Sequence, residues 1–158
     1  MSTAVYPHAP VAESFEKGLA FQDFVCIQLA KRNIVLQNIS SKKYQFEFGE
    51  NLQGFEIKLD QRCTDTGRLS IEVAEKSARN VSVWTPSGIC RDDNSIVYIQ
   101  GNYDCFWVFM KNWLLRYLDQ KSPQIEEFNG TIRRFFLPIS DANVGAGFRW
   151  TKEDAHGR

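Results

Sequence analysis

The sequence predicts a mixed α/β domain in which helices flank a central sheet. Apolar residues recur at helical spacing between Phe15 and Leu29 near the amino terminus. Short segments that alternate strictly between apolar and polar residues follow, and such alternation is typical of half-buried strands. A continuous apolar run from Cys105 to Met110 then leads into a second helical pattern. An order of helix, several strands, helix and strand is characteristic of mixed α/β domains.

Length and composition indicate one globular domain. The chain has 158 residues, of which 43% are hydrophobic and 13% aromatic, enough to form a core without disulfides or structural metal. We expect a flexible segment at 1–12, the domain at 13–150 and a tail at 151–158. The formal net charge of +0 argues against a strongly basic DNA-coating protein, although a local basic groove remains possible. No stretch resembles a membrane span or a secretory leader, so we expect a cytoplasmic protein without membrane association.

The amino-terminal half contains one expected helix and several expected strands. The helix runs from Glu13 to the basic stop at Lys31-Arg32-Asn33. Residues 34–36 predict a short strand or bridge, and Tyr44–Phe48 predicts an alternating strand closed by Gly49. The most informative part is an expected hairpin over 54–76, which turns through Thr64-Asp65-Thr66-Gly67.

The carboxyl-terminal half predicts a strand at 95–100 and a strand at 105–110 that is buried on both faces. The second helix passes through Trp113 and Leu118 and ends near Lys121, and a last strand covers 133–138. Trp107 and Trp113 are expected in the core because their neighbours are apolar. Trp84 lies in an irregular segment, where it could stack on a nucleic-acid base or cover the core.

Alternation in the expected hairpin places several charges on one face. Phe55, Ile57 and Leu59 share the core side of the first segment, and Glu56, Lys58 and Asp60 share the other side. In the second segment Glu72 lies opposite the apolar positions. Carboxylates gathered in this way repel one another unless a cation lies among them, so a divalent metal ion is the natural ligand. A solvated ladder of cross-strand ion pairs is the alternative that alternation alone leaves open.

Histidine and cysteine chemistry receives no support from the sequence. The two histidines, His8 and His156, lie near the ends of the chain. The four cysteines are scattered without any Cys-x-x-Cys pair, so no zinc site is indicated and free thiols are expected. The carboxylate cluster is therefore the main candidate for function.

The order of elements and these charges resemble the PD-(D/E)XK nuclease superfamily, whose fold is restriction-endonuclease-like. Gly54-Phe55-Glu56 looks like the first hairpin motif, and Glu72, 16 positions after Glu56, looks like the acid of the second. From the helix near Phe15 to Lys76 the chain is similar to small phage-type members of this superfamily. That segment covers about half of the chain, and its motifs are short and degenerate.

The resemblance implies a nuclease that binds Mg²⁺ or Mn²⁺ and hydrolyses DNA. The implied metal ligands are Asp60, Glu72 and Glu56. Alternatively, Glu56 does not touch the metal and instead contacts the residues that bind it. Lys58 is the implied catalytic lysine, with Lys76 as its substitute, and Glu72 and Glu56 share the catalytic site. Arg62, Arg68 and Arg79 flank this site and are the expected DNA contacts, and a homodimer is possible because many relatives cut as dimers.

Two positions depart from the superfamily pattern. The first helix has Gln22 where a glutamate is expected, with Asp23 and Glu16 as nearby alternatives, and Ala74 occupies the usual lysine position. These departures keep a second function open, an inactive nuclease fold that acts as a binding or inhibitor protein. A third possibility is an unrelated α/β protein without a nucleic-acid role.

Overall fold

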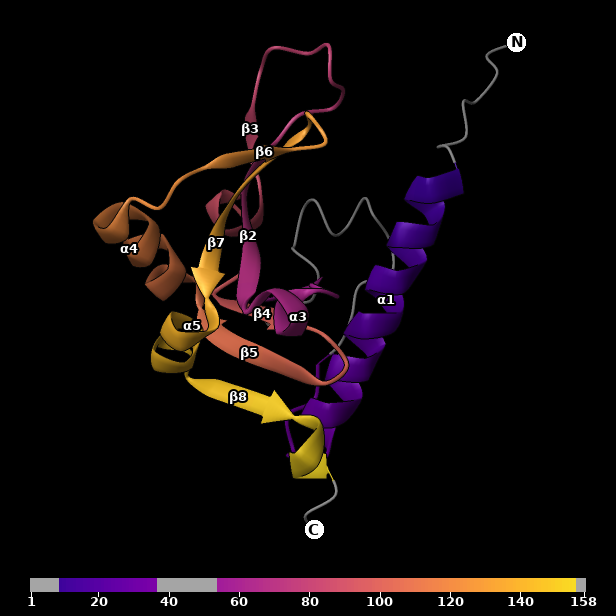
Figure 1. Cartoon of the computed structure of the whole chain (residues 1–158). Helices are drawn as coiled ribbons and strands as arrows, with labels where there is room; N and C mark the ends of the chain where they lie inside the picture. The colour runs from indigo at the N-terminus through magenta and orange to yellow at the C-terminus, as the bar shows by residue number, and fades with distance from the viewer. Residues whose placement is uncertain (1–8, 37–53, 156–158) are drawn as a thin grey trace.

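The computed structural model describes residues 9–36 and 54–155. Within these ranges the strands form two four-stranded sheets, in the orders β1-β4-β5-β8 and β3-β2-β7-β6 (Figure 1). The strands are β1 (Phe55–Leu59), β2 (Arg68–Glu75), β3 (Thr85–Pro86), β4 (Val97–Gly101), β5 (Cys105–Met110), β6 (Glu126–Phe128), β7 (Ile132–Pro138) and β8 (Phe148–Thr151). The helices are α1 (Ala9–Ala30), α3 (Cys63–Thr66), α4 (Lys111–Lys121) and α5 (Ile139–Gly145), with short 3-10 turns η1 (Gly88–Cys90) and η2 (Lys152–Ala155).

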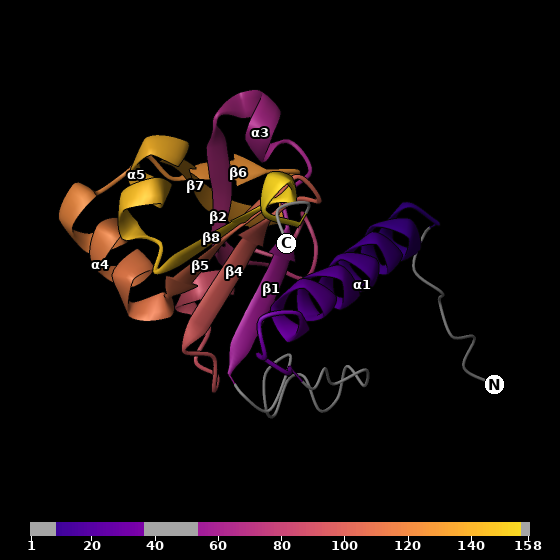
Figure 2. The ribbon, with the colours of Figure 1, turned by 90° about the horizontal axis from the view of Figure 1, so that it is seen from below.

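The first sheet packs against α1, which lies along β1 (Figure 2). Strand β1 pairs in parallel with β4, whereas β4 with β5 and β5 with β8 are antiparallel. Phe21 and Val25 of the helix meet Ile57, Ile99 and Phe106 in one buried cluster. Burial of this apolar surface fixes the amino-terminal helix on β1.

The second sheet is built on the antiparallel pair β2 and β7, whose register shifts between Glu72 and Ala74. Its buried side chains form a second cluster with residues of the first sheet and α4, including Leu69, Ile71, Trp107, Phe109, Leu114 and Phe135. Strand β5 contributes Phe106 to one cluster and Trp107 to the other. The prediction that this apolar run forms a strand buried on both faces is thus confirmed.

Several expected elements are present. Strands β4, β5 and β7 and helix α4 match the segments predicted at 95–100, 105–110, 133–138 and around 113–121. Helix α1 begins at Ala9, inside the segment expected to be flexible, and β8 with η2 reaches into the expected tail. Residues 34–36 form no strand. The strand expected at 44–48 lies outside the described residues.

The predicted hairpin is wrong, because β1 and β2 belong to different sheets. The residues between them form the short helix α3, which ends at Gly67 with φ of 68°. This connection carries the chain out of the first sheet and into the second. Alternation predicted correctly that both segments are strands, but it contains no information about which strand lies beside which.

No helix in the described part of the chain has the length and apolar character that crossing a membrane requires.

Candidate active site

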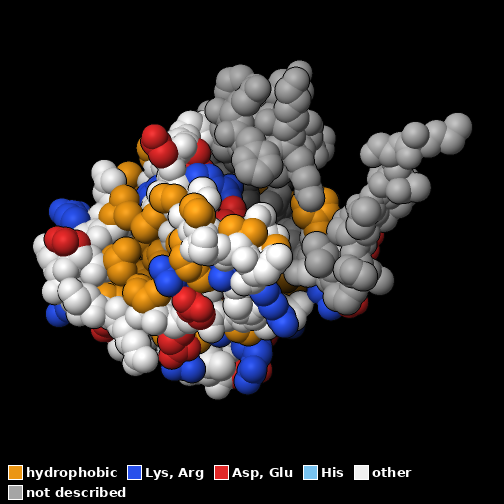
Figure 3. Space-filling model, turned by 90° about the horizontal axis from the view of Figure 1, so that it is seen from above, with side chains coloured by type: hydrophobic (Ala, Val, Ile, Leu, Met, Phe, Trp, Pro, Cys, Tyr) orange, Lys and Arg blue, Asp and Glu red, His pale blue; other side chains and the backbone are white. Residues whose placement is uncertain are grey.

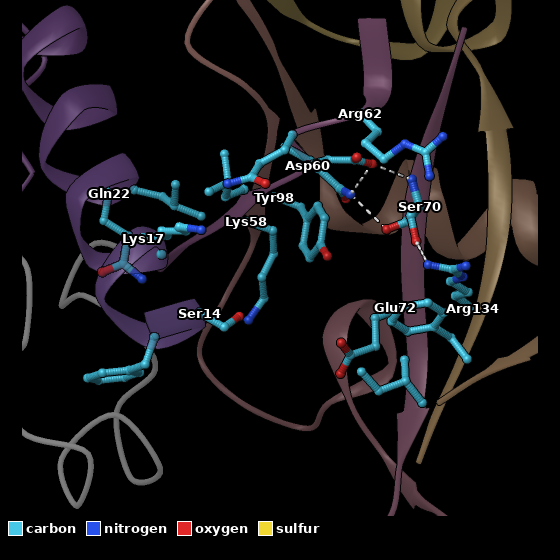
Figure 4. A pocket seen from close by; sticks show the side chains of 18 of the residues that line it. Ser14, Lys17, Gln22, Lys58, Asp60, Arg62, Ser70, Glu72, Tyr98 and Arg134 are labelled. Carbon is cyan, nitrogen blue, oxygen red and sulfur yellow. Dashed lines mark hydrogen bonds between the residues drawn. The ribbon is translucent and has the colours of Figure 1, made fainter. Parts of the chain in front are cut away.

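A cleft of about 950 Å³ lies between α1, the end of β1 and the exposed face of β2 and β7. Helix α1 contributes Gln22 to its lining, β1 contributes Lys58, and β2 contributes Glu72. Asp60 lines it from the residue after β1, and Arg134 from β7 (Figure 4). Although the predicted strand pairing is wrong, the cleft brings together Gln22, Lys58, Asp60 and Glu72.

Asp60 lies where the two sheets meet. Its Oδ2 atom accepts hydrogen bonds from the backbone N–H of Ser70 at 2.8 Å and from Nε2 of Gln100 at 3.3 Å. Gln100 Nε2 also donates to the backbone oxygen of Ser70 at 2.7 Å. Glu72 is two residues beyond Ser70 on the same face of β2, about 6.7 Å further along the strand. Asp60 and Glu72 both line the cleft, and Ser70 lies between them (Figure 4).

Glu72 is held by residues that follow β3. The Ser87 hydroxyl donates to Oε1 of Glu72 at 2.5 Å. The next residue, Gly88, has φ of 51°, and a Cβ atom there would lie 2.3 Å from the backbone oxygen of Glu72. Only glycine allows this approach. Ser87 thus fixes the carboxylate of Glu72, and Gly88, the first residue of η1, fixes its backbone.

Lys58 and Glu56 form an ion pair along β1. Lys58 Nζ lies 3.2 Å from Glu56 Oε1, and Glu56 is 2% exposed. Lys58 lines the cleft, whereas Glu56 is not among its lining residues. In the described part of the chain, no three Asp, Glu, His or Cys side chains converge as a metal-binding group. A site of three carboxylates, as the sequence led us to expect, is therefore absent from these residues.

Two other expected residues lie away from the cleft. The Lys76 ammonium lies 4.8 Å from the centroid of the Trp84 ring. Arg79 donates from Nε to the backbone oxygen of Asn129 at 2.9 Å and packs against Gly130. Of the predicted DNA contacts, Arg62 and Arg68 line the cleft and Arg79 does not.

Trp84 belongs to a second groove, of about 640 Å³, on the other face of β2 and β7. Arg133 covers the Trp84 ring at 4.2 Å and pairs with Glu127 at 3.0 Å. This groove is lined by Val73, Ala74, Trp84, Pro86, Cys90, Leu118, Ile125, Glu127 and Arg133. Figure 3 shows that hydrophobic side chains gather on the face of the molecule seen from above. Two cations of the chain itself, Lys76 and Arg133, thus already contact the Trp84 ring.

Helix α1 contributes Gln22, which is 9% exposed, at the position where the resemblance led us to expect a glutamate. Its alternatives, Glu16 and Asp23, are exposed and are not among the residues that line the cleft. The helix therefore supplies an amide and no carboxylate at this position.

Sequence reasoning missed Arg134, Ser70 and Gln100. Arg134 Nη1 donates to the Ser70 hydroxyl at 3.2 Å, and both side chains face the cleft (Figure 4). Alternation along β7 contained a usable signal for Arg134, because Arg133 and Arg134 must point to opposite faces. Gln100 had no such signal, since its role depends on how the two sheets meet.

The cleft contains more cations than carboxylates. Lys17 pairs with Glu13 at 2.7 Å, and Arg91 pairs with Glu75 at 3.3 Å. By contrast, no carboxylate in the described part of the chain pairs with the other arginines of the lining, Arg62, Arg68 and Arg134. Three guanidinium groups are thus available to an anionic ligand.

A pair of cysteines lies behind Asp60. Cys63 is fully buried, and its backbone N–H donates to the backbone oxygen of Asp60 at 3.3 Å. A hydrogen bond to Cys105, together with burial, raises the pKa of the Cys63 thiol. All four cysteines are free thiols, as the sequence predicts.

Comparison of the chain with protein-family models, curated proteins and solved structures gave no significant match.

Proposed function

We propose that this protein is a metal-dependent nuclease that hydrolyses phosphodiester bonds in DNA. The observation that carries the proposal is that Asp60, Glu72 and Lys58 line one cleft, which is also lined by Arg62, Arg68 and Arg134. Carboxylates beside a lysine suit metal-assisted hydrolysis, and unpaired guanidinium groups suit phosphate.

The residues of the cleft fit Mg²⁺ or Mn²⁺. Magnesium commonly binds to one or two carboxylates and keeps several of its waters, so the proposal requires no third carboxylate besides Asp60 and Glu72. The Oε1 atom of Gln100, which is 2% exposed, has no hydrogen-bond partner among the described residues. Its neutral oxygen is a further hard ligand beside Asp60. Bound there, the ion would supply a water of lowered pKa and neutralise charge on the phosphate.

The other side chains have separate roles in this proposal. Lys58 orients the attacking water and stabilises the negative charge that develops on the phosphate. Glu56, ion-paired with Lys58, limits the positions that the lysine can adopt. Gln22, at the α1 side of the cleft, would accept a hydrogen bond from a water bound to the ion but contributes no charge. The arginines bind the DNA backbone.

The resemblance to PD-(D/E)XK nucleases supports the same activity. Under this proposal the two-sheet α/β architecture is a variant of the restriction-endonuclease-like fold, related to small phage-type members. A homodimer that presents two clefts to opposite DNA strands is part of the proposal. Sedimentation equilibrium measures the oligomeric state directly.

The test is cleavage of supercoiled and branched DNA with and without Mg²⁺ or Mn²⁺. We expect nicking by the wild type that depends on the metal and is lost in Asp60→Asn and Glu72→Gln. Glu127→Gln is the matched control, because this carboxylate lies at the second groove. Cleavage that survives in both cleft variants would overturn the proposal.

A second candidate is an inactive nuclease fold that binds DNA or protein without cutting. The observations that favour it are Gln22 in place of a glutamate and the convergence of only two acids in the described part of the lining besides Glu13. Calorimetry with Mn²⁺ separates the two functions. Absence of metal binding and of cleavage on all substrates, with DNA binding retained, would favour the inactive protein.

A further inference from the structure

The wall of the cleft formed by β2 and β7 has alternating aromatic and guanidinium groups. Arg68 lies 3.7 Å from the centroid of the Phe136 ring, and Arg134 lies 4.8 Å from the same centroid. Arg134 also lies 4.1 Å from the centroid of Phe128. In the β2–β7 register, Ser70 is opposite Phe136, while Arg68 and Arg134 flank this pair on either side. One guanidinium group therefore reaches the ring from each direction along the strands.

Stacking on aromatic rings determines the orientation of these two guanidinium groups. A guanidinium group that rests its face on an aromatic ring keeps its N–H donors at the edge, where they match the oxygens of a phosphate. Arg134 uses Nη1 to donate to Ser70 Oγ at 3.2 Å, which fixes its rotation. The hydroxyl of Ser70 accepts this bond and keeps its own proton for another acceptor.

Arg134 does not pair with the acid directly across from it. Glu72 and Arg134 are register partners, and opposite charges at such positions commonly attract. Here Glu72 is held by Ser87, and Arg134 is held by Ser70 and two aromatic rings. No ion pair joins them among the described residues. Both charges remain available, side by side, for a ligand that needs an anion-binding group next to a carboxylate.

We infer that Arg134 and Arg68, oriented by Phe136, form a phosphate-binding subsite that holds the DNA backbone next to Glu72. The inference rests on the proposed function only for the identity of the ligand. A phosphate beside the reacting one would occupy the subsite, and its contacts would set the position of the strand relative to Asp60 and Glu72. Arg134 is in this account a binding residue, and Phe136 positions it.

The test measures DNA binding in the absence of cleavage. Fluorescence anisotropy of a labelled DNA duplex and of its single strand is recorded in EDTA, over a salt series of about 50 to 200 mM. We expect Arg134→Gln and Arg68→Gln each to weaken binding about tenfold, as the loss of a charge-assisted contact does. Each should also lower the slope of log affinity against log salt by about 0.7 to 0.9.

Arg133→Gln is the matched control, because it removes the neighbouring arginine on the opposite face, which also stacks on an aromatic ring. We expect this variant to bind DNA with wild-type affinity and slope. Equal losses in Arg133→Gln and Arg134→Gln would mean that general charge is responsible and would overturn the subsite. Wild-type affinity and slope in Arg134→Gln would overturn it as well.

Arg134→Lys keeps the inference testable if the glutamine variant folds poorly. It retains the charge and loses the planar group, so we expect an unchanged salt slope with weaker affinity. Affinity equal to that of the wild type would contradict the role of stacking.

Failure of the subsite and failure of the nuclease are distinguishable. A wild type that never cuts, with the expected loss in Arg134→Gln, contradicts only the nuclease. Cleavage with unchanged binding in Arg134→Gln contradicts only the subsite.

Discussion

Glu72 owes its position to two consecutive small residues, Ser87 and Gly88. The hydroxyl of Ser87 bonds to the carboxylate, and the missing side chain of Gly88 lets the turn approach the backbone of Glu72. In the proposed function Glu72 binds the metal ion, and removing a group that orients a metal ligand typically lowers metal affinity or activity. The two residues are tested by different measurements: Ser87 by metal affinity and cleavage, and Gly88 by the free energy of unfolding.

If the protein is the proposed nuclease, Ser87→Ala should lower Mn²⁺ affinity and DNA cleavage about 10- to 100-fold, because Glu72 loses the bond that orients it. Calorimetry and cleavage kinetics measure the two effects. Ser77→Ala, at an exposed position after β2, is the control and should resemble the wild type. Unchanged metal affinity in Ser87→Ala would show that Glu72 does not depend on this hydroxyl.

Gly88→Ala should destabilise the protein by about 2 kcal/mol or more, because an unfavourable φ is combined with overlap between the new Cβ and the backbone of Glu72. Gly67→Ala is a matched control. Gly67 has φ of 68°, but a Cβ there meets nothing within 4 Å, so its cost should be about 1 kcal/mol. Urea denaturation measures both variants, and equal losses would mean that the overlap at Gly88 is relieved at no cost.

At the scale of elements, a buried ion pair fixes the start of α4. Lys111 Nζ donates to Asp93 Oδ1 at 3.0 Å, to the backbone oxygen of Arg91 at 2.7 Å and to Ser95 Oγ at 3.0 Å. The Lys111 and Asp93 side chains are 8% and 5% exposed. The pair attaches the loop before β4 to the helix that follows β5.

Asp93 predicts a pH dependence of stability. Burial opposes its charge, but hydrogen bonds from Ser95 and Lys111 outweigh burial and lower its pKa. Its contribution to stability is therefore complete above the ordinary aspartate pKa of about 3.9 and is lost as pH falls through the depressed value. Urea denaturation across this acid range should show that loss in the wild type.

Lys111→Met should destabilise the protein by about 3 kcal/mol at neutral pH, because Asp93 would remain buried without its cation. In this variant the loss of stability in acid should be much smaller, or reversed in sign. Lys121→Met, at the exposed end of the same helix, is the control. An equal pH dependence in Lys111→Met and the wild type would contradict the assignment of the ion pair.

Elements were predictable where a local pattern is long or strongly apolar. The run from Cys105 to Met110 and the helix after it follow from residue types alone, and β4 and β7 were predicted as short segments rich in β-branched and aromatic residues. The strands β3 and β6 were missed because two or three residues show no periodicity, and the helix α5 was missed because its sequence shows no clear helical pattern. Their structure depends on neighbours such as β2 and β7.

At the scale of the whole molecule, Gln100 joins the two sheets. It belongs to β4 in the first sheet and donates to the backbone oxygen of Ser70 in the second, next to Asp60. The amide is buried, so the backbone oxygen of Ser70 would lose its side-chain partner if Gln100 were removed.

Gln100→Leu should lower the free energy of unfolding by about 1 to 3 kcal/mol, the usual cost of a buried acceptor left without a donor. If Asp60 binds the metal as proposed, Mn²⁺ affinity should fall as well, because Asp60 loses the same donor. Gln124→Leu, at an exposed position, is the control for stability. Thermal denaturation and calorimetry measure the two effects, and a variant with reduced stability and normal metal affinity would separate Gln100 from the site.

The candidate site was predictable in its residue types more than in its geometry. Lys58, Asp60 and Glu72 were recognised because charges alternate with apolar residues in two strands, and all three line the cleft. The pairing that was supposed to bring them together is wrong, and a contact between two sheets replaces it. Arg134 and Gln100 come from strands distant in sequence, and only the packing of the sheets brings them to Asp60.

The Cys63 thiol provides a natural probe of this junction. It is fully buried, its pKa is raised, and its own backbone is bonded to that of Asp60. A thiol in this state reacts with an alkylating reagent only when the surrounding structure opens. The rate of its modification would therefore report how often the two sheets separate at the cleft, without any label being introduced.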